Sequence, residues 1–179
     1  MSTHGPVSRL DAAADGALEP LRNNRLSVAA FGAASRVGDF SVVWHALGLL
    51  RAVGSLERLR EAVFLSCALG VESLVVNQGV KRAFRRTRPT LSGDERFEVR
   101  TPSTSSFPSG HASSAAFAVI VLAGFTGWPV AWLFVAVGVL VTLSRVVVRI
   151  HHMSDILGGV AVGAVLGVLA RAVAIPLLG

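Results

Sequence analysis

The sequence predicts an all-α integral membrane protein, a helix bundle of about five transmembrane helices with an N-terminal amphipathic surface helix. Hydrophobic residues make up 52% of the 179-residue chain and charged residues only 16%, whereas a soluble domain usually carries about 25% charged residues. Residues 101–144 contain no Asp, Glu, Lys or Arg, and a helix needs only about 20 apolar residues to cross a bilayer. This uncharged stretch is therefore long enough for two crossings.

The N-terminal part is predicted to differ from the rest, with a surface segment over residues 1–35 and a membrane-embedded domain over residues 36–179. Apolar residues recur at helical spacing between positions 7 and 25, which is typical of a helix lying along a membrane surface. The apolar piece at 26–35 is too short to cross alone. Because residues 1–25 mix Arg, Asp and Glu and lack an apolar core, we expect no cleavable secretory signal.

Five apolar segments follow, and each is predicted to be a transmembrane helix. The tripeptide Gly127-Trp128-Pro129 divides the long uncharged stretch into the third and fourth segments. The last segment is rich in Gly and Ala, whose small side chains let helices approach closely. A charged loop over residues 82–100 separates the second segment from the third. The five segments are residues 40–56, 62–80, 110–126, 130–148 and 155–170.

The distribution of basic residues predicts which face of the membrane each loop occupies. Five crossings place the N-terminal region, residues 81–100 and residues 145–153 on one face, which holds 13 of the 17 Lys and Arg residues. By the positive-inside rule this face is cytoplasmic. The net charge of +6 does not indicate nucleic acid binding, because the arginines flank apolar segments and meet lipid phosphates there. The only cysteine, Cys67, excludes an internal disulfide and is expected to be buried.

Three separated motifs carry side chains suited to an anion, and all fall at helix ends on that same face. The first is Lys81, the only lysine of the chain, followed after six residues by Arg88-Pro89. Arginine offers a planar fork for two phosphoryl oxygens, whereas lysine offers a compact point charge. Taken alone, the motif could equally be a basic cluster that flanks a membrane helix. The arginines between these residues are expected to bind anionic lipid or headgroup: Arg82, Arg85 and Arg86.

The second motif is Pro108-Ser109-Gly110-His111. Ser109 is a natural N-cap, Gly110 lets the backbone approach a ligand closely, and the free N–H groups at a helix start attract anions. His111 would lie in the first turn of that helix and can transfer a proton near neutral pH. In isolation, an ordinary serine-capped helix with an interfacial histidine explains the motif equally well.

The third motif combines Ser144-Arg145 with His151 and Asp155. A carboxylate close to a histidine can accept a hydrogen bond from Nδ1–H, which fixes the tautomer and leaves Nε2 free as a nucleophile. Charged groups at the end of a membrane helix are costly unless they have partners or a function, and the alternative is a solvated turn with incidental charges. Arg145 and His151 are six positions apart, so they cannot share one helix face, and we expect the helix to end between them.

Together the motifs K-x6-RP, PSGH and SR-x5-H-x3-D resemble the three signatures of the type-2 phosphatidic acid phosphatase superfamily, the lipid phosphate phosphatases. The resemblance implies that His151 attacks phosphorus to form a phosphohistidine, that Asp155 orients it, and that His111 protonates the leaving group. It also implies that no metal or other cofactor is needed. Many members have six spans, whereas five are predicted here. The residues implied in phosphate binding are Lys81, Arg88, Ser109, Gly110 and Arg145.

The resemblance leaves the lipid substrate open. The small size, five spans and Arg-, Ala- and Val-rich composition are most similar to small members that act on polyprenyl-phosphoryl-phosphoribose in cell wall synthesis, in the bacterial inner (plasma) membrane. Undecaprenyl diphosphate and phosphatidylglycerol phosphate are the alternative substrates. A vanadate-type haloperoxidase relative and a non-enzymatic lipid-binding membrane protein are alternatives of other classes. The expected partners are a lipid phosphate and the bilayer, and the sequence leaves open whether copies form a homo-oligomer.

Five further polar residues lie near these motifs or within the predicted spans. Arg149, His152 and Glu72 are candidates for contacting the substrate headgroup, although an acid inside a membrane helix can equally make a structural hydrogen bond. His45 and Asp39 belong to the region of the first predicted span; they could line the pocket, but a position at the membrane interface is favoured.

Overall fold

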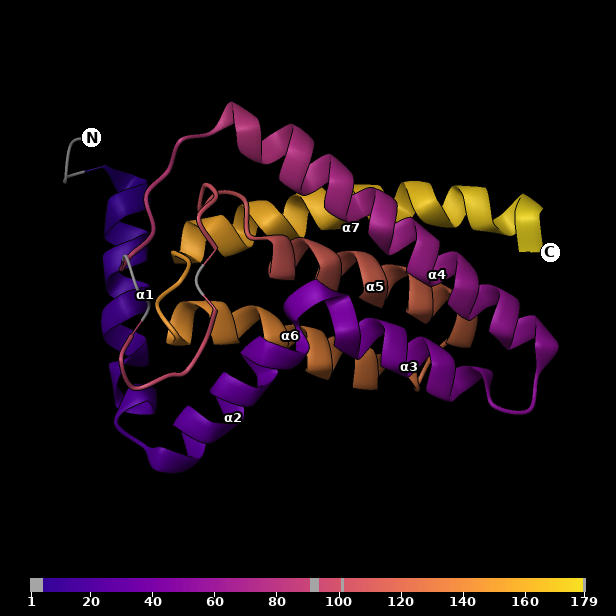
Figure 1. Cartoon of the computed structure of the whole chain (residues 1–179), viewed down its shortest axis with the longest axis horizontal. Helices are drawn as coiled ribbons and strands as arrows, with labels where there is room; N and C mark the ends of the chain where they lie inside the picture. Colours follow the sequence, from indigo (N-terminus) through magenta and orange to yellow (C-terminus); the bar gives the residue numbers. More distant parts are fainter. Residues whose placement is uncertain (1–4, 91–93, 101, 179) are drawn as a thin grey trace.

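The computed structural model, drawn in Figure 1, describes residues 5–90, 94–100 and 102–178. These residues form helices and connecting loops with no β-strand among them, which confirms the all-α fold class. The α-helices are α1 (Pro6–Arg22), α2 (Arg25–Val37), α3 (Val42–Ala52), α4 (Leu56–Leu74), α5 (Gly110–Thr126), α6 (Ala131–Val147) and α7 (Met153–Leu178). Three short helical turns accompany them: η1 (Asp39–Ser41), η2 (Val75–Gly79) and η3 (Val80–Ala83).

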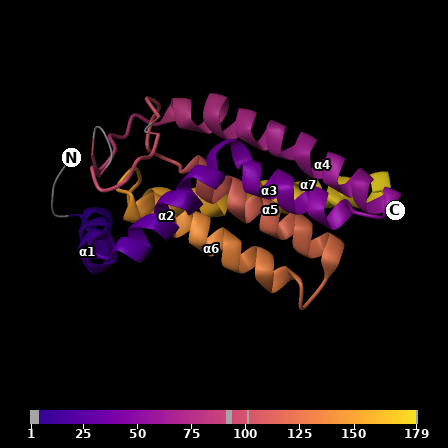
Figure 2. The same ribbon diagram turned by 60° about the horizontal axis from the view of Figure 1, so that its bottom comes forward.

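The helix α5 forms the centre of the bundle and packs against α3, α4, α6 and α7. Helix α1 lies across one end of the bundle, and α2 runs obliquely from there toward α3 (Figures 1 and 2). The long loop before α5 and the turn between α6 and α7 lie at the same end as α1, whereas the α3–α4 and α5–α6 turns lie at the opposite end. One end of the molecule therefore collects every segment that carries a motif.

The helix bounds agree with the predictions best in the C-terminal half. Helix α5 covers the predicted residues 110–126, and α6 ends at Val147, so the helix does end between Arg145 and His151. Helix α7 continues to Leu178, well past the predicted end at residue 170. Helix α3 is short because it begins only after the η1 turn, whose backbone interrupts the helical path between α2 and α3.

The number of membrane spans stays a prediction. Among the described helices, only α7 is long and apolar enough to cross a membrane as a single straight helix. Helix α2 and the η1–α3 segment meet the same criterion only as a pair bent by 68°. Helices α5 and α6 have 17 residues each, which is the lower limit of the range of about 17–25 residues for a transmembrane helix.

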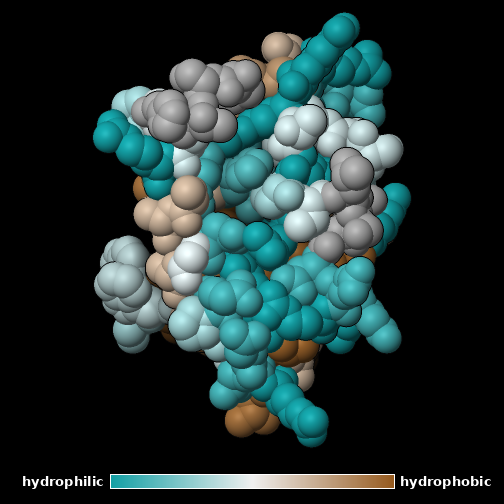
Figure 3. Space-filling model, turned by 90° about the vertical axis from the view of Figure 1, so that its left-hand side faces the viewer, coloured by the Kyte–Doolittle hydropathy of each residue, from teal (hydrophilic) through white to brown (hydrophobic). Residues whose placement is uncertain are grey.

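The flank of the bundle exposes large apolar side chains to its surroundings. Val71 on α4, Leu133 on α6 and Val165 on α7 are all more than half exposed, and Cys67, which was expected to be buried, is exposed on α4. Soluble monomers rarely expose apolar patches of this extent, whereas a lipid-facing surface does. The end of the molecule that carries α1 is by contrast largely hydrophilic (Figure 3). An apolar flank with a polar end is the surface of a membrane protein.

Close packing of α5 on α7 aligns the second motif with the third. A methyl group in place of the Gly163 hydrogen would lie 2.0 Å from the backbone oxygen of Ser113, and one at Gly159 would lie 2.4 Å from that of Ser109. Only glycine allows the two backbones to approach this closely, as the Gly- and Ala-rich composition predicted. The approach lets the Ser109 N–H donate to the backbone oxygen of Asp155 at 3.0 Å.

Polar side chains attach α1 to the end of the bundle. Arg22 is 1% exposed, and its guanidinium donates to the backbone oxygens of Val147 at 2.9 Å and Val146 at 3.1 Å. These are two of the carbonyl groups that a helix C-terminus leaves without intrahelical partners, so Arg22 caps α6. Helix α1 is thus packed on the protein itself, and the predicted position along the membrane surface stays a prediction.

Candidate active site

The three motifs meet around one cavity at the polar end of the bundle. The cavity has a volume of about 570 Å³, and its lining includes Lys81, Gly110, His111, Arg145 and His151. These side chains come from η3, the first turn of α5, the last turn of α6 and the α6–α7 turn. The fold therefore brings together residues that lie up to 70 positions apart in the chain.

Lys81 lies just beyond α4, where the helix widens into the π-helical turn η2 and then tightens into η3. Changes of winding of this kind are frequent at functional sites. Lys81 is only 7% exposed, and a methyl group on Gly110 would lie 3.7 Å from its Nζ. Burial, together with the positive charges of Arg88 and Arg145, lowers the pKa of Lys81 to about 8.

Backbone carbonyl groups from two segments hold the guanidinium of Arg88. Nε donates to the oxygen of Pro102 at 3.0 Å and Nη2 to that of Thr104 at 3.1 Å, both in the loop before α5. Nη1 donates to the oxygen of Ile150 at 3.0 Å and lies 3.3 Å from Nε2 of His151. The loop before α5 thus holds Arg88 against His151.

The second motif starts α5 as predicted. The Ser109 hydroxyl accepts a hydrogen bond from the N–H of Ala112 at 3.4 Å and so caps the helix. In the first turn, Nε2 of His111 lies 3.2 Å from Oδ1 of Asp39 and 3.2 Å from the backbone oxygen of Ser35. Both partners are acceptors, so Nε2 carries a proton. Asp39 thus contacts a motif residue, and its expected position at the membrane interface stays a prediction.

Arg145 is almost fully buried at the end of α6, with 1% exposure. Its Nη1 donates to the hydroxyl of Ser35 on α2, while Nε and Nη2 have no hydrogen-bond partner among the residues that the structure describes. Unpaired buried donors are costly in free energy, and this guanidinium borders the cavity. Its planar fork suits an anion with at least two oxygens.

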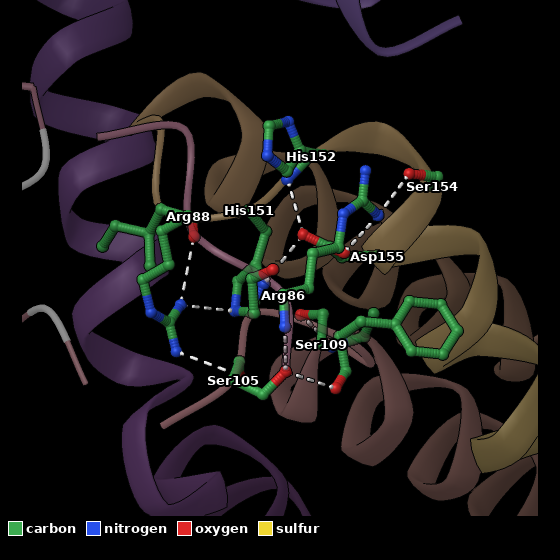
Figure 4. Close-up of polar contacts among 12 residues, drawn as sticks. Arg86, Arg88, Ser105, Ser109, His151, His152, Ser154 and Asp155 are labelled. Atoms are coloured by element: carbon green, nitrogen blue, oxygen red, sulfur yellow. Dashed lines mark hydrogen bonds and ion pairs between the residues drawn. The ribbon is translucent and has the colours of Figure 1, made fainter. Parts of the chain in front are cut away.

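His151 lies between Arg88 and Asp155 (Figure 4), and its ring is 2% exposed. A guanidinium only donates, so the contact with Arg88 makes Nε2 the unprotonated nitrogen and leaves the proton on Nδ1. Nδ1 lies 3.6 Å from Oδ2 of Asp155, slightly beyond hydrogen-bond distance. Burial, reinforced by Arg88 and Arg145 and opposed by Asp155, lowers the pKa of His151 to about 3. The imidazole is therefore neutral near pH 7.

Arg86, expected to bind anionic lipid, instead makes buried ion pairs. Its Nη1 donates to Oδ1 of Asp155 at 2.6 Å and to the hydroxyl of Ser154 at 2.7 Å. Its Nη2 donates to Oδ2 of Asp11 on α1 at 2.6 Å. The second oxygen of Asp155 accepts from the N–H of His152 at 2.8 Å. The guanidinium of Arg86 is thus bound to carboxylates of the protein, so the expectation that it binds anionic lipid is wrong. Both oxygens of Asp155 have a partner, and Arg86 is the partner of one of them (Figure 4).

Two residues of the first predicted spans border the same cavity. Glu72 on α4 is 3% exposed and accepts a hydrogen bond from the hydroxyl of Ser113. His45 on α3 lines the cavity, and its Nδ1 lies 2.9 Å from the hydroxyl of Ser66. Glu72 therefore combines a structural hydrogen bond with a place at the site.

The other two candidate headgroup contacts lie on the α1 side of His151. Arg149 and His152 border a second cavity of about 620 Å³, whose lining also includes residues of α1. Nη2 of Arg149 lies 2.7 Å from Oδ2 of Asp15 on that helix. His151 lines both cavities, so its ring separates the α1 side from the side that carries Lys81 and Arg145.

Three residues contact motif residues, and a fourth, Asp11, contacts Arg86 and Ser154; the sequence did not predict these contacts. Ser35 and Asp11 lie in helices with several other small or acidic residues, and no local pattern distinguishes them. Asp39 follows a glycine at a break between apolar segments, which was the one signal available for it. Arg86 lies among other arginines. Only the three-dimensional contacts single them out.

Comparisons with known sequences place the chain in a family. The PAP2 superfamily model matches residues 61–175, which include all three motifs. The decaprenylphosphoryl-5-phosphoribose phosphatase of Mycobacterium tuberculosis is 33% identical over 139 residues, covering 78% of this chain and 76% of the relative. That of Mycolicibacterium smegmatis is 38% identical over 129 residues, covering 71% and 68%. Undecaprenyl-diphosphatase BcrC of Bacillus subtilis is 27% identical over 135 residues, covering 74% and 69%.

Solved structures show the same fold. A PAP2-type phosphatidylglycerolphosphate phosphatase from Bacillus subtilis superposes with a TM-score of 0.64 at 20% identity, covering 95% of this chain and 87% of the other. Aquifex aeolicus LpxE superposes with a TM-score of 0.68 at 19% identity, covering 88% and 93%. Because the family model spans more than half of the sequence and the mycobacterial relatives exceed 30% identity, the chain belongs to the PAP2 superfamily and is a lipid phosphate hydrolase.

Proposed function

We propose that this enzyme hydrolyses a polyprenyl-phosphoryl-phosphoribose through a phosphohistidine formed on His151. The observation that carries the mechanism is the position of the neutral imidazole of His151, with the Arg88 guanidinium 3.3 Å from Nε2 and the Asp155 carboxylate 3.6 Å from Nδ1. This arrangement keeps Nε2 unprotonated, so its lone pair can attack once a phosphoryl group takes the place of the Arg88 contact. It also places a negative charge where the ring becomes positive as the N–P bond forms.

In the first proposed step, Nε2 of His151 attacks phosphorus, the N–P bond forms and the P–O bond to the ribose breaks. Lys81, Arg88 and Arg145 stabilise the charge on the phosphoryl oxygens, which is the main requirement of phosphoryl transfer. His111 gives a proton to the leaving alkoxide. In the second step, His111 takes a proton from water as the water oxygen attacks phosphorus. The N–P bond breaks, and inorganic phosphate and free His151 are released.

The shape of the site supports a substrate with a long apolar tail. A third cavity, of about 460 Å³, is apolar and lies between α4, α5 and α7. Its lining includes Phe64, Val71, Leu166 and Leu169. Glu72 lines this cavity and also the polar cavity around Lys81 and His151, so the two cavities lie on either side of one residue. A lipid tail can occupy the apolar cavity while its phosphate reaches the polar one.

The names of the relatives favour phosphoribose as the headgroup. Both mycobacterial relatives, at 33% and 38% identity, are named decaprenylphosphoryl-5-phosphoribose phosphatase. The polar cavity also has neutral hydrogen-bonding side chains next to Lys81, from Ser73, Asn77 and Gln78, and these suit sugar hydroxyl groups. Undecaprenyl diphosphate is the second candidate, because BcrC is a relative at 27% identity.

A cytoplasmic active site is part of this proposal. The motif-bearing end of the molecule carries the excess of Lys and Arg residues that marks cytoplasmic loops. A cysteine placed between residues 94 and 100, in a Cys67→Ser background, should resist a membrane-impermeant thiol reagent in intact cells. Ready labelling of that cysteine would reverse the proposed orientation.

A substrate panel tests the proposed activity. Purified protein in detergent, with EDTA present, is assayed for phosphate release from phosphoribosyl polyprenol phosphate, undecaprenyl diphosphate and phosphatidylglycerol phosphate. We expect the highest kcat/KM on the phosphoribosyl lipid and no turnover by His151→Ala. Turnover by His151→Ala would exclude His151 as the nucleophile. A higher kcat/KM on the diphosphate would replace the substrate assignment and leave the mechanism standing.

A further inference from the structure

We infer that Asp11 of helix α1 is a positioning residue for the phosphoryl transfer, acting through Arg86 on the carboxylate of Asp155. This inference rests on the proposed function, in which Asp155 orients His151. It assigns a role in turnover to the N-terminal helix, which lies outside the segment that matches the family model.

The bridge consists of a cation between two carboxylates. Nη1 of Arg86 lies 2.6 Å from Oδ1 of Asp155, and Nη2 lies 2.6 Å from Oδ2 of Asp11. The exposed fractions of the three side chains are 18% for Arg86, 8% for Asp11 and 0% for Asp155. Little water reaches the contacts, so each ion pair is screened weakly. Loss of Asp11 leaves Asp155 as the one carboxylate partner of Arg86 among the described residues.

Asp11 also fixes the residue that precedes Asp155. Its Oδ1 accepts from the N–H of Ser154 at 2.9 Å, and its Oδ2 accepts from the Ser154 hydroxyl at 2.8 Å. Ser154 belongs to the first turn of α7, whose N–H groups have no intrahelical partners. Asp11 therefore holds both the backbone next to Asp155 and, through Arg86, the side chain of Asp155.

The two oxygens of Asp155 have separate partners, and this sets the orientation of the carboxylate. Oδ1 is bound by Arg86, whereas Oδ2 accepts from the N–H of His152 and is the oxygen that faces Nδ1 of His151 at 3.6 Å. Without Asp11, the Arg86 guanidinium keeps only Ser154 and Asp155 as hydrogen-bond partners among the described residues, so it holds Oδ1 less firmly. Misplacement of a catalytic group by about 1 Å is enough to reduce turnover about a hundredfold.

Other contacts attach α1 to the protein independently of Asp11. Arg22 caps α6, Asp15 pairs with Arg149, and Glu19 pairs with Arg96. A substitution at Asp11 should therefore leave α1 in place. Glu19 offers a matched control, because Glu19→Gln removes two ion pairs of the same helix without touching Arg86 or Asp155.

The experiment compares Asp11→Asn, Asp11→Glu and Glu19→Gln by kcat and KM per folded molecule and by melting temperature in detergent. We expect Asp11→Asn to lower kcat about tenfold with KM nearly unchanged, and Asp11→Glu to recover part of the loss. Glu19→Gln should keep kcat within about twofold, and its melting temperature should fall less than that of Asp11→Asn, because the Glu19 side chain is 44% exposed. Equal kcat values for Asp11→Asn and Glu19→Gln would overturn the inference.

A double substitution tests whether Asp11 acts through Arg86. In an Arg86→Gln background, Asp11→Asn should change kcat by less than about twofold, because the bridge is already broken. A full additional tenfold loss would overturn the inference. If Asp11→Asn does not fold, Arg86→Lys replaces it, since one ammonium group cannot bridge two carboxylates as a planar fork does. An unchanged kcat in Arg86→Lys would likewise overturn it.

Including His151→Ala in the same series distinguishes a wrong nucleophile from a wrong role for Asp11. Turnover by His151→Ala would exclude the proposed nucleophile and the inference with it. An inactive His151→Ala beside a normal Asp11→Asn would overturn the inference alone. An inactive His151→Ala with a reduced kcat in Asp11→Asn is the result that we expect.

Discussion

Nη1 of Arg88 lies 3.3 Å from Nε2 of His151, and this contact determines which nitrogen of the histidine is free to react. A guanidinium has five donors and no acceptor, so Nε2 must present its lone pair to Arg88 and the proton must be on Nδ1, toward Asp155. The same guanidinium is fixed by backbone oxygens of Pro102 and Ile150. A bound phosphoryl group can take the place of the Nε2 contact and bring phosphorus to the nucleophile.

The first prediction concerns this arginine. Arg88→Lys should lower kcat/KM about a hundredfold, because one ammonium group cannot bind several backbone carbonyls and face the phosphoryl oxygens as well. Arg60→Lys is the control, since Arg60 is exposed near the start of α4, at the end of the bundle opposite the motifs, and it should stay within about twofold of wild type. Steady-state kinetics in detergent measure both. Similar values for the two variants would show that the fork of Arg88 is not required.

The second prediction concerns the only lysine. Lys81→Arg should lose most of its activity with little change in melting temperature, because the guanidinium is larger than the ammonium and Lys81 is packed near Gly110. Arg85→Lys should be nearly silent. Phosphate release and thermal unfolding are measured for both. Equal activity in the two variants would mean that the single lysine has no special function.

The third prediction follows from the lowered pKa of Lys81, about 8, which burial causes chiefly. Below this pH the side chain is charged and attracts the phosphate, and above it the charge is lost, so kcat/KM should fall as pH rises through about 8. The residual activity of Lys81→Arg should keep its kcat/KM at higher pH, because arginine stays protonated. An alkaline limb at the same pH in both proteins would assign it to another group.

The fourth prediction concerns the contact of α5 with α7. Gly163→Ala should lower the melting temperature strongly or prevent folding, because its methyl group would lie 2.0 Å from the backbone oxygen of Ser113. Gly70→Ala on α4 is the control, since a methyl group there meets nothing within 4 Å, and alanine favours a helix by about 1 kcal/mol. Thermal unfolding in detergent compares them. Equal melting temperatures would contradict the close packing described here.

Most of the bundle could be predicted from the sequence because its signals are local. The bounds of α5 follow from a serine N-cap at one end and Gly127 at the other, and the end of α6 follows from the spacing of Arg145 and His151. The Gly- and Ala-rich composition predicted the close approach of α7. The motifs themselves predicted that Lys81, His111 and Arg145 would share one cavity, which is what the structure has.

The residues behind the motifs could not be predicted, because their signals depend on partners far away in the chain. Asp11 and Arg86 are 75 positions apart, and Arg145 and Ser35 are 110 positions apart. An acidic residue on an amphipathic helix has the same local pattern whether it faces water or a buried arginine. Cys67 was expected to be buried because it lies in an apolar run, but it is exposed. An apolar run does not distinguish a position in the protein core from one that faces lipid.

The most direct test of the proposed mechanism is to trap the phosphoenzyme. The protein is mixed with substrate labelled in its terminal phosphate, quenched in alkali, where phosphohistidine survives and phosphoserine esters are lost, and the labelled peptide is sequenced. The proposed mechanism predicts a label on His151 that is acid-labile and missing from His151→Ala. A label on another residue, or an equal label in His151→Ala, would contradict it.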